Sequence, residues 1–142
     1  MTLVKRTLGL DVGDRRIGVA MSDPMGYTAQ RLTLLERHTL ERDVRAIETL
    51  VNEHEAQGIV VGLPLNMDGS IGDQAKKVMA FAETLKARLA CPVHLWDERL
   101  TTMQGERSLL ETDTSRRKRK QVIDQVAAQL ILQHYLDAAR PA

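Results

Sequence analysis

Residues 8–14 read Leu8-Gly9-Leu10-Asp11-Val12-Gly13-Asp14. Apolar residues alternate with Gly9 and Asp11, which is the period-two pattern of a β-strand, and Gly13-Asp14 indicates a turn directly after it. Asp11 therefore lies inside a predicted strand. A carboxylate there is costly to bury unless it is paired, protonated or bound to a metal ion, although an Asp that closes the following turn is the simpler alternative.

Two further strands and a helix follow this first strand. The pattern predicts strands over Ile17–Ser22 and Ala29–Leu35, with Pro24 and Gly26 marking the turn between them. Because the links are short, the three strands should form an antiparallel meander. Thr39 is a suitable N-cap for the helix that follows. The apolar residues of that helix recur at the helical period and are Leu40, Val44, Ile47 and Val51.

The second half of the chain alternates strands with helices. Residues 58–63 form a continuous apolar run, which is typical of a strand covered on both faces in a parallel sheet. Asp73 is predicted to cap the next helix, and Pro92 precedes a fifth strand over Val93–Glu98. The remaining predictions are a short helix over 101–110, a polar and basic stretch over 111–121, and a final helix over Val122–Ala139.

The order of these elements defines the fold class. Three strands, then helix, strand, helix, strand and two helices predict a mixed α/β sheet of five strands, with strands 1–3 antiparallel, strands 4 and 5 parallel, and helices on both faces. We see no internal repeat and expect one domain over residues 1–142. In such sheets ligands bind beyond the carboxyl ends of the strands.

Composition narrows the classes of protein. Lys and Arg number 20 against 19 Asp and Glu, so attraction to a polyanion must come from local clusters of charge. Cys91 is the only cysteine, which favours a reducing compartment, and no apolar run is long enough for a signal peptide or a membrane span. We therefore expect a cytoplasmic protein with no membrane partner. Aromatic residues make up only 3% of the chain, which argues against binding of single strands by base stacking.

Further acidic positions stand out beside Asp11. Asp97-Glu98 closes the fifth strand, and Asp124 precedes a small and apolar stripe within residues 127–131 that should face the sheet. A solvated strand end is the simpler explanation for Asp97-Glu98, and a favourable place at the positive end of the helix dipole is the simpler one for Asp124. Strand parity alone does not choose between Asp97 and Glu98.

Three carboxylates near strand ends suit metal-ion catalysis. Two divalent ions about 3.5–4 Å apart can activate a water and neutralise the leaving oxygen of a phosphodiester. Oxygen ligands point to Mg or Mn, and none of the four histidines has the spacing of a zinc site. The chain also lacks dinucleotide-binding and Walker phosphate loops and the nucleophile elbow of serine hydrolases.

Cations cluster beside these acids. Directly before the helix with Asp124 stand Arg116, Arg117, Lys118, Arg119 and Lys120. Either a solvated loop or a phosphate-binding segment explains this run.

Single polar residues elsewhere are candidates for the same substrate. Arg15 and Arg16 in the first hairpin could contact the same nucleic-acid backbone. Arg99 is either a further contact or an ion-pair partner of the acids before it. Asn66 and Asp68 either position the scissile phosphate or build their own turn.

Four motifs span nearly the whole chain. They are Leu10-Asp11-Val12-Gly13 with Gly18-Val19-Ala20, then Val61-Gly62-Leu63-Pro64-Leu65-Asn66-Met67-Asp68-Gly69, then Asp97-Glu98-Arg99-Leu100-Thr101-Thr102, and Asp124-Gln125-Val126-Ala127-Ala128. Together they resemble the YqgF family, also called RuvX. The resemblance implies an RNase H-like fold related to Holliday junction resolvases. It also implies a nuclease that acts on such junctions, on the 5′ end of the 16S ribosomal RNA precursor, or on both.

Carried over by motif, the resemblance implies that Asp11, Glu98 and Asp124 are catalytic acids that bind two Mg or Mn ions. The expected partners are structured RNA or branched DNA and ribosomal precursor particles, and a homodimer would suit symmetrical cleavage of a junction. If the fourth strand lies between the first and the fifth, Asp11 and Glu98 start roughly 9–10 Å apart. Glu98 must then lean inward.

Two other functions are compatible with the sequence. Asp11-x-Gly13 followed by Gly18 also resembles the first phosphate loop of sugar kinases and Hsp70-type ATPases. Those proteins enclose ATP between two such domains, and 142 residues provide room for one. The second alternative is a non-catalytic module that binds RNA or the ribosome, in which the acids are structural. Metal-dependent hydrolysis separates this alternative from a nuclease.

Overall fold

The computed structural model describes the backbone of residues 6–100 and 116–139 and the side chains of residues 6–99 and 125–139. The short helix predicted over 101–110 lies outside these residues. The described elements are, in chain order, β1 (Thr7–Val12), β2 (Arg16–Ser22), β3 (Ala29–Glu36), α1 (Leu40–Glu53), β4 (Gly58–Leu63), α2 (Asp73–Arg88), β5 (Val93–Asp97), the 3-10 helix η1 (Glu98–Leu100) and α4 (Arg116–Ala139).

The strands form one mixed sheet in the order β3-β2-β1-β4-β5. β2 pairs antiparallel with β1 and β3, and β4 pairs parallel with β1 and β5. β4 is thus flanked on both sides, and Val60 and Val61 at its centre are completely buried, as its continuous apolar run predicts. The predicted fold class, with its antiparallel meander and two parallel strands, is confirmed.

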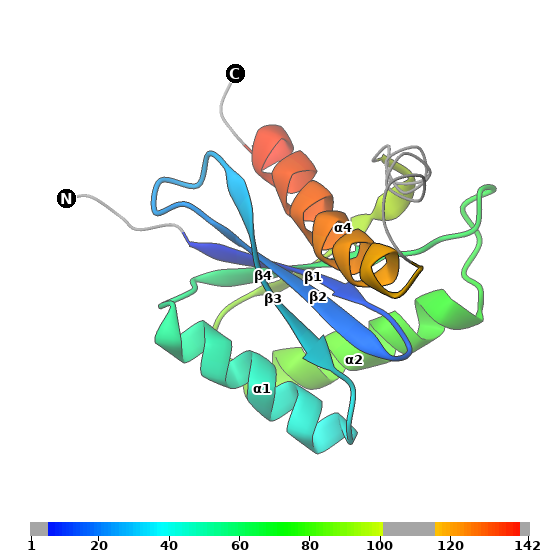
Figure 1. Ribbon diagram of the computed structural model, residues 1–142, viewed down its shortest axis with the longest axis horizontal. Coiled ribbons are helices and arrows are strands. Elements are labelled where there is room, and N and C mark those ends of the chain that lie inside the picture. Colours follow the sequence, from blue (N-terminus) through cyan, green and yellow to red (C-terminus); the bar gives the residue numbers. More distant parts are fainter. Residues whose placement is uncertain (1–5, 101–115, 140–142) are drawn as a thin grey trace.

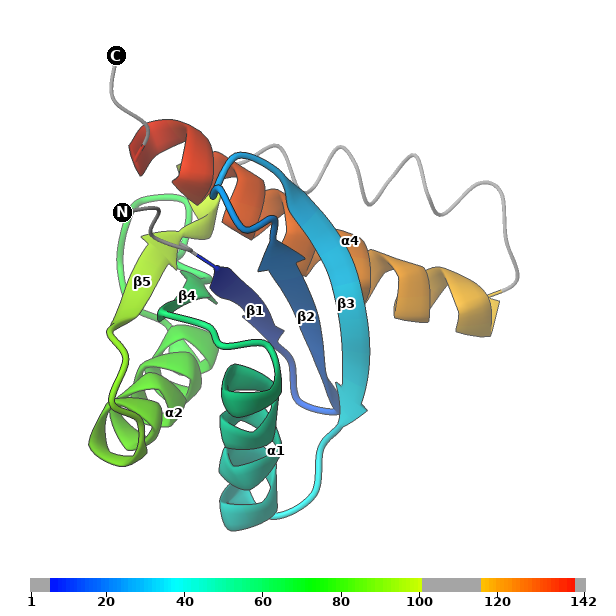
Figure 2. The same ribbon diagram turned by 90° about the vertical axis from the view of Figure 1, so that its left-hand side faces the viewer.

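Helices cover both faces of the sheet, as Figures 1 and 2 show, with α1 and α2 on one face and α4 across the other. Because side chains alternate along each strand, successive residues pack into one of two apolar cores, one on each face of the sheet. Leu8, Leu10 and Val12 of β1 pack in the core with α1 and α2. The second core joins strand residues such as Ala20 and Val60 to the inner face of α4, namely Ala127, Ala128, Ile131, Leu132 and Leu136.

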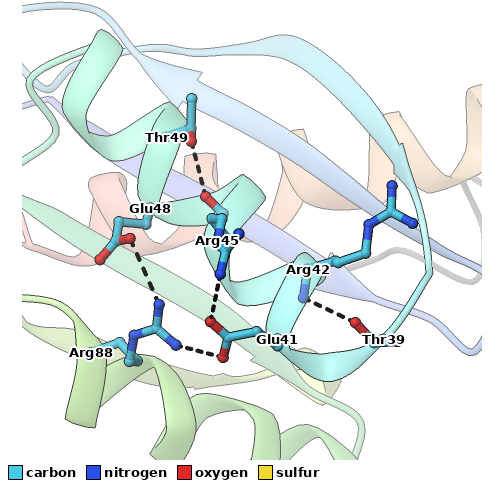
Figure 3. A network of polar contacts seen from close by, with 7 residues as sticks. All are labelled: Thr39, Glu41, Arg42, Arg45, Glu48, Thr49 and Arg88. Carbon is cyan, nitrogen blue, oxygen red and sulfur yellow. Dashed lines mark hydrogen bonds and ion pairs between the residues drawn. The ribbon is translucent and has the colours of Figure 1, made fainter.

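An ion-pair network connects α1 and α2 at the surface (Figure 3). Arg88 of α2 donates from Nη1 to Glu41 at 2.7 Å, and its Nη2 lies 3.8 Å from Glu48. The hydrogen bond from Arg88 holds the pKa of the Glu41 carboxyl below its usual value. These side chains are solvent-exposed, so water screens the pairs and the apolar core provides most of the helix packing.

A buried carboxylate fixes the turn that follows Asp11. Asp43 in α1 is 3% exposed and accepts hydrogen bonds at 2.8 Å from Arg37 Nε and from the His38 backbone N–H. Arg37 also donates to the carbonyl of Gly13 at 2.7 Å, so its guanidinium joins the β1–β2 turn to the start of α1. A buried charge is tolerated only with such partners, and this arrangement restrains the end of β1.

Two glutamines of α4 connect the helix to the start of β3. Gln129 Nε2 donates to the Ala29 carbonyl at 3.0 Å, and Gln133 Oε1 accepts from the Ala29 N–H at 2.9 Å. Gln133 also donates to the carbonyl of Tyr27 at 3.0 Å. Both backbone groups of Ala29 therefore bind α4, which fixes the position of the helix along the sheet.

Three predicted boundaries were wrong. Gly72, not Asp73, is the N-cap of α2, and Asp73 is its first helical residue, where its charge still favours the positive helix end. β5 ends at Asp97 and Glu98 opens η1, because the chain curls into a 3-10 turn there. α4 begins at Arg116 rather than Val122, because Arg, Lys and Gln are good helix formers and extend the helix into the basic run.

Within the described residues, no helix has the length and apolar character needed to cross a membrane.

Candidate active site

Asp11 lies on the α4 face of the sheet, near the carboxyl end of β1. Leu10 and Val12 on either side of it belong to the opposite core, so strand alternation places Asp11 on the same face as Gly9. An added Cβ on Gly9 would lie 2.7 Å from Leu132 Cβ, which shows how closely α4 approaches this face. The Asp11 side chain is only partly exposed.

Glu98 reaches the same face from the far side of β4. An added Cβ on Gly62 would lie 2.6 Å from Glu98 Oε1 and 2.5 Å from Ile131 Cδ1, so the Glu98 carboxylate lies over Gly62 beside α4. Leu10 of β1 pairs with Val61 of β4, and the two strands are parallel. Asp11 and Gly62, each one residue further along, therefore lie side by side on adjacent strands. Adjacent strands are about 4.8 Å apart. The expected inward lean of Glu98 is therefore present, and it occupies the space that the missing side chain of Gly62 provides.

Asp97 takes part in a different set of contacts. Its Oδ2 accepts from Arg99 Nη2 at 2.8 Å, and its Oδ1 accepts from the Arg99 backbone N–H at 2.9 Å. These bonds hold the pKa of the Asp97 carboxyl below its usual value, mainly through the Arg99 side chain. Of the two neighbouring acids, Glu98 thus projects over the sheet while Asp97 binds Arg99.

Arg99 connects η1 to the loop between β4 and α2. Its Nη1 donates to the Met67 carbonyl at 3.2 Å, and a Cβ added on Gly69 would lie 3.2 Å from the same Nη1. Of the two sequence interpretations of Arg99, the structure shows the ion pair, which it makes with Asp97, and adds the contact with this loop. The contacts fix the loop relative to Glu98, because Glu98 and Arg99 are consecutive.

The polar side chains of that loop also face one another. Asn66 Nδ2 donates to Ser70 Oγ at 2.9 Å, and Asp68 Oδ1 accepts from the Ser70 backbone N–H at 2.9 Å and from its hydroxyl at 2.6 Å. The Ser70 hydroxyl is the main cause that lowers the pKa of the Asp68 carboxyl. The sequence allowed Asn66 and Asp68 either to position the scissile phosphate or to build their own turn. The structure shows hydrogen bonds that build the turn.

The cations of the first hairpin lie next to Asp11 along the chain. Arg15 is exposed in the β1–β2 turn, where its carbonyl accepts from the Arg37 backbone N–H at 2.8 Å. Arg16 opens β2, and alternation with Gly18 and Ala20 places it on the α4 face. Arg16 therefore shares its face of the sheet with Asp11.

Position 124 lies in the amino-terminal half of α4, one helical turn before Ala128. The side chain of Asp124 and those of Arg116, Arg117, Lys118, Arg119 and Lys120 lie outside the described side chains. Their backbone is helical, so the basic run occupies the first turns of α4 rather than a loop. Figure 1 shows this end of α4 on the same side of the molecule as the turn after β1 and the loop after β4.

The donor set of the described residues suits a hard divalent cation. Asp11 and Glu98 bring two carboxylates to one face, and carboxylate oxygens are the ligands that Mg and Mn prefer. Among residues 6–99 and 125–139, no group of three or more His, Cys, Asp or Glu side chains is close enough to hold a metal ion.

Sequence reasoning missed Gly62 and the contact of Arg99 with the loop after β4, and both shape this site. Gly62 leaves room for the Glu98 carboxylate, and Arg99 links η1 to the Met67 carbonyl. A glycine in the middle of an otherwise apolar strand was the available signal for Gly62, since such a glycine often marks a close approach of another group. The Arg99 contact joins residues 32 positions apart, and no local pattern indicates it.

Comparison with known families identifies the family of this chain. A family model described as "RuvX: Holliday junction resolvase" matches residues 5–138. The chain belongs to the RuvX family. It is accordingly a nuclease, and thus a hydrolase, as the resemblance of its motifs predicted.

Curated proteins similar to this RuvX chain include two bacterial sequences, each with the name "Putative pre-16S rRNA nuclease". The protein of Moorella thermoacetica is 57% identical over 132 residues, which cover 93% of this chain and 94% of that one. The protein of Myxococcus xanthus is 54% identical over 136 residues, which cover 96% and 90% of the two chains.

Solved structures with a similar fold include two resolvases. RuvC of T. thermophilus in complex with a Holliday junction substrate has a TM-score of 0.60 and 11% identity, with 94% of each chain covered. The resolvase of fowlpox virus in complex with Holliday junction DNA has a TM-score of 0.60 and 8% identity, with 96% of this chain and 99% of that one covered. At these identities the likeness concerns the RNase H-like fold.

Proposed function

We propose that this RuvX chain is a metal-dependent endonuclease that hydrolyses phosphodiester bonds in structured nucleic acid. The observation that carries the proposal is the position of Glu98 over Gly62, next to the strand position of Asp11 and on the same face. Asp124 is the proposed third acid, since its helix covers this face. The whole chain, residues 1–142, is proposed to act as one cytoplasmic nuclease domain.

Mg or Mn is the proposed cofactor, held by Asp11, Glu98 and Asp124. Two such ions, when bound, supply Lewis acids that activate a water and stabilise the leaving oxygen. The chain's own contribution is to hold carboxylates on rigid elements. Asp11 lies within β1, whose following turn is fixed through Arg37 and Asp43, and the Glu98 carboxylate lies over Gly62, where the Ile131 side chain also packs.

The proposed substrate is the precursor of 16S ribosomal RNA, at its 5′ end and within ribosomal precursor particles. Its support is the name of relatives that are 57% and 54% identical over nearly the whole chain. A Holliday junction is the second candidate, because the description of the family model names it. Symmetrical cleavage of a junction would require two active sites, so a homodimer belongs to this second candidate.

A cleavage panel tests the proposed function. The wild-type chain should cut structured RNA or junction DNA in Mg or Mn and should lose activity in excess chelator, because the carboxylates act through the ions. Continuous duplex DNA serves as the third substrate, and Asp11→Asn prepared in parallel reveals any contaminating nuclease. Full activity in chelator, or equal activity of Asp11→Asn, would contradict the proposal.

The basic run at the start of α4 is proposed to bind phosphates. The helix begins with five consecutive cations, Arg116 to Lys120, and has no acidic residue in its first turn. Cations at this end oppose the helix dipole at a cost of about 0.3–1 kcal/mol each. Phosphate groups would offset that cost, because both the side chains and the helix end attract anions.

Neutralising this run should weaken binding to every nucleic-acid sequence alike. Replacement of all five cations by Gln keeps the helix propensity, and each lost phosphate contact should flatten the slope of log affinity against log salt by about 0.9 on duplex DNA or about 0.7 on single strands. Affinities measured over a salt series for wild type and variant decide the matter. Superimposable lines would mean that the run makes no phosphate contact.

A further inference from the structure

Met67 is the most exposed large apolar residue among the described side chains, at 84%. It lies in the loop between β4 and α2, which also carries the exposed Ile71. Single exposed apolar residues are common on protein surfaces, so exposure alone does not indicate a binding site. Met67 differs from a chance exposed residue in two respects: hydrogen bonds within its loop fix the backbone around it, and Arg99 connects that loop to Glu98.

The loop is held in one conformation by its own hydrogen bonds. The Asn66 backbone N–H donates to the Ser70 carbonyl at 3.0 Å, and the Gly69 N–H donates to the Asn66 carbonyl at 2.8 Å. Gly69 adopts a φ of +88°, a conformation that other residues rarely take. Together with the bonds of Asp68 to Ser70, these contacts close a rigid turn with Met67 near its tip.

Arg99 fixes this turn to the active site. The Met67 carbonyl accepts from Arg99 Nη1 at 3.2 Å, and Arg99 is itself held by Asp97. Glu98, whose carboxylate lies over Gly62, is the residue directly before Arg99. The backbone of Met67 is therefore fixed relative to a proposed catalytic acid while its side chain extends into solvent.

We propose that Met67 is an apolar wedge that packs against unstacked nucleobases beside the scissile phosphate. The inference rests on the proposed function and adds that the nuclease prefers substrates with bases at branch points and at the ends of nucleic-acid duplexes. Nucleic-acid-binding proteins insert Leu, Ile, Met and similar side chains between bases, at a cost of a few kcal/mol per unstacked step. That cost is least where a base is already unpaired. A fixed loop reduces the entropy lost on insertion.

Fluorescence of 2-aminopurine next to the cleavage site tests the wedge without turnover. Asp11→Asn is the parent protein, and the probes are a branched RNA stem and a four-way DNA junction, each with 2-aminopurine beside the branch. Binding of the parent should increase the fluorescence of at least one probe, because unstacking relieves quenching. Met67→Ala should lose more than half of that increase.

The same variant should bind roughly tenfold more weakly, which is the size expected when one apolar side chain is no longer buried. The slope of log affinity against log salt should not change, because no phosphate contact is removed. Met67→Leu should retain the fluorescence response. Met25→Ala is the matched control, since Met25 is 55% exposed in the β2–β3 turn, which Figure 1 places at the opposite end of the sheet from the Met67 loop.

Two results would overturn the wedge. In the first, the Asp11→Asn parent protein binds neither probe, or binds without a change in fluorescence. In the second, the Met67→Ala variant gives the same increase in fluorescence as the parent protein. An equal response would also leave a protein partner as the reason for the exposure of Met67. Failure of the proposed function is seen separately, as absence of cleavage by the wild type in the substrate panel.

Discussion

Glu98→Gln should reduce the cleavage rate by about two to three orders of magnitude, whereas Asp97→Asn should reduce it only a few-fold. The two acids are neighbours, but Glu98 projects over Gly62 toward the position of Asp11, and Asp97 binds Arg99. Removing the charge of Glu98 therefore removes a proposed metal ligand. Removing the charge of Asp97 weakens only the link that holds the Met67 loop.

Single-turnover cleavage in Mg or Mn measures both effects, with circular dichroism as the check that each variant is folded. Asp11→Asn and Asp124→Asn should behave like Glu98→Gln, because each removes one charge from the proposed site. In the absence of metal, none of these three substitutions should lower the melting temperature of the protein, because each removes one negative charge from a group of acids that repel one another. If Asp97→Asn is the inactive variant and Glu98→Gln is active, the assignment on this segment is wrong.

The second large effect is expected at two glycines that face α4. Gly62→Ala should reduce cleavage by about a hundredfold and lose less stability than Gly9→Ala, since misplacing a catalytic group by about 1 Å can cost that much activity. The new Cβ would meet Glu98 Oε1 at 2.6 Å and Ile131 Cδ1 at 2.5 Å. Glu98 Oε1 is the end of a flexible side chain and can move, which displaces the carboxylate, whereas Ile131 is completely buried and has less room to move.

Gly9→Ala is the contrasting variant. Its Cβ would meet Leu132 Cβ at 2.7 Å and the Ala128 carbonyl oxygen at 3.0 Å, and neither can move without shifting the helix. Overpacking of this kind typically costs about 1–3 kcal/mol, so the melting temperature should fall clearly. Thermal denaturation and cleavage rates of the two variants give the comparison. A stable Gly9→Ala, or a fully active Gly62→Ala, would contradict the close packing of α4 on this face.

Most of the fold could be predicted because its elements have strong periodic patterns. Leu8, Leu10 and Val12 alternate with Gly9 and Asp11 in the period of a strand, and residues 58–63 are apolar without interruption because β4 is covered on both faces. Element order and the handedness of crossovers then leave few arrangements of the sheet. The start of α4 was missed because a run of cations resembles a loop in composition although each residue is a good helix former.

The candidate site was predictable only in part. Asp11 stood out because a carboxylate interrupts an apolar strand, and the inward lean of Glu98 followed from strand spacing. The space over Gly62 and the contacts of Arg99 with the loop were not predictable, because they depend on tertiary positions. The ion pair of Arg99 with a neighbouring acid was one of two sequence interpretations, because Asp97 and Glu98 directly precede it.

The glutamine bonds of α4 have a consequence for solubility. β3 is an edge strand, and edge strands present backbone groups that can recruit strands from other molecules and start aggregation. At Ala29 both backbone groups are already bound by Gln129 and Gln133. The same helix that covers the active face therefore also occupies the backbone groups of Ala29, so that a foreign strand could not pair with β3 at this position.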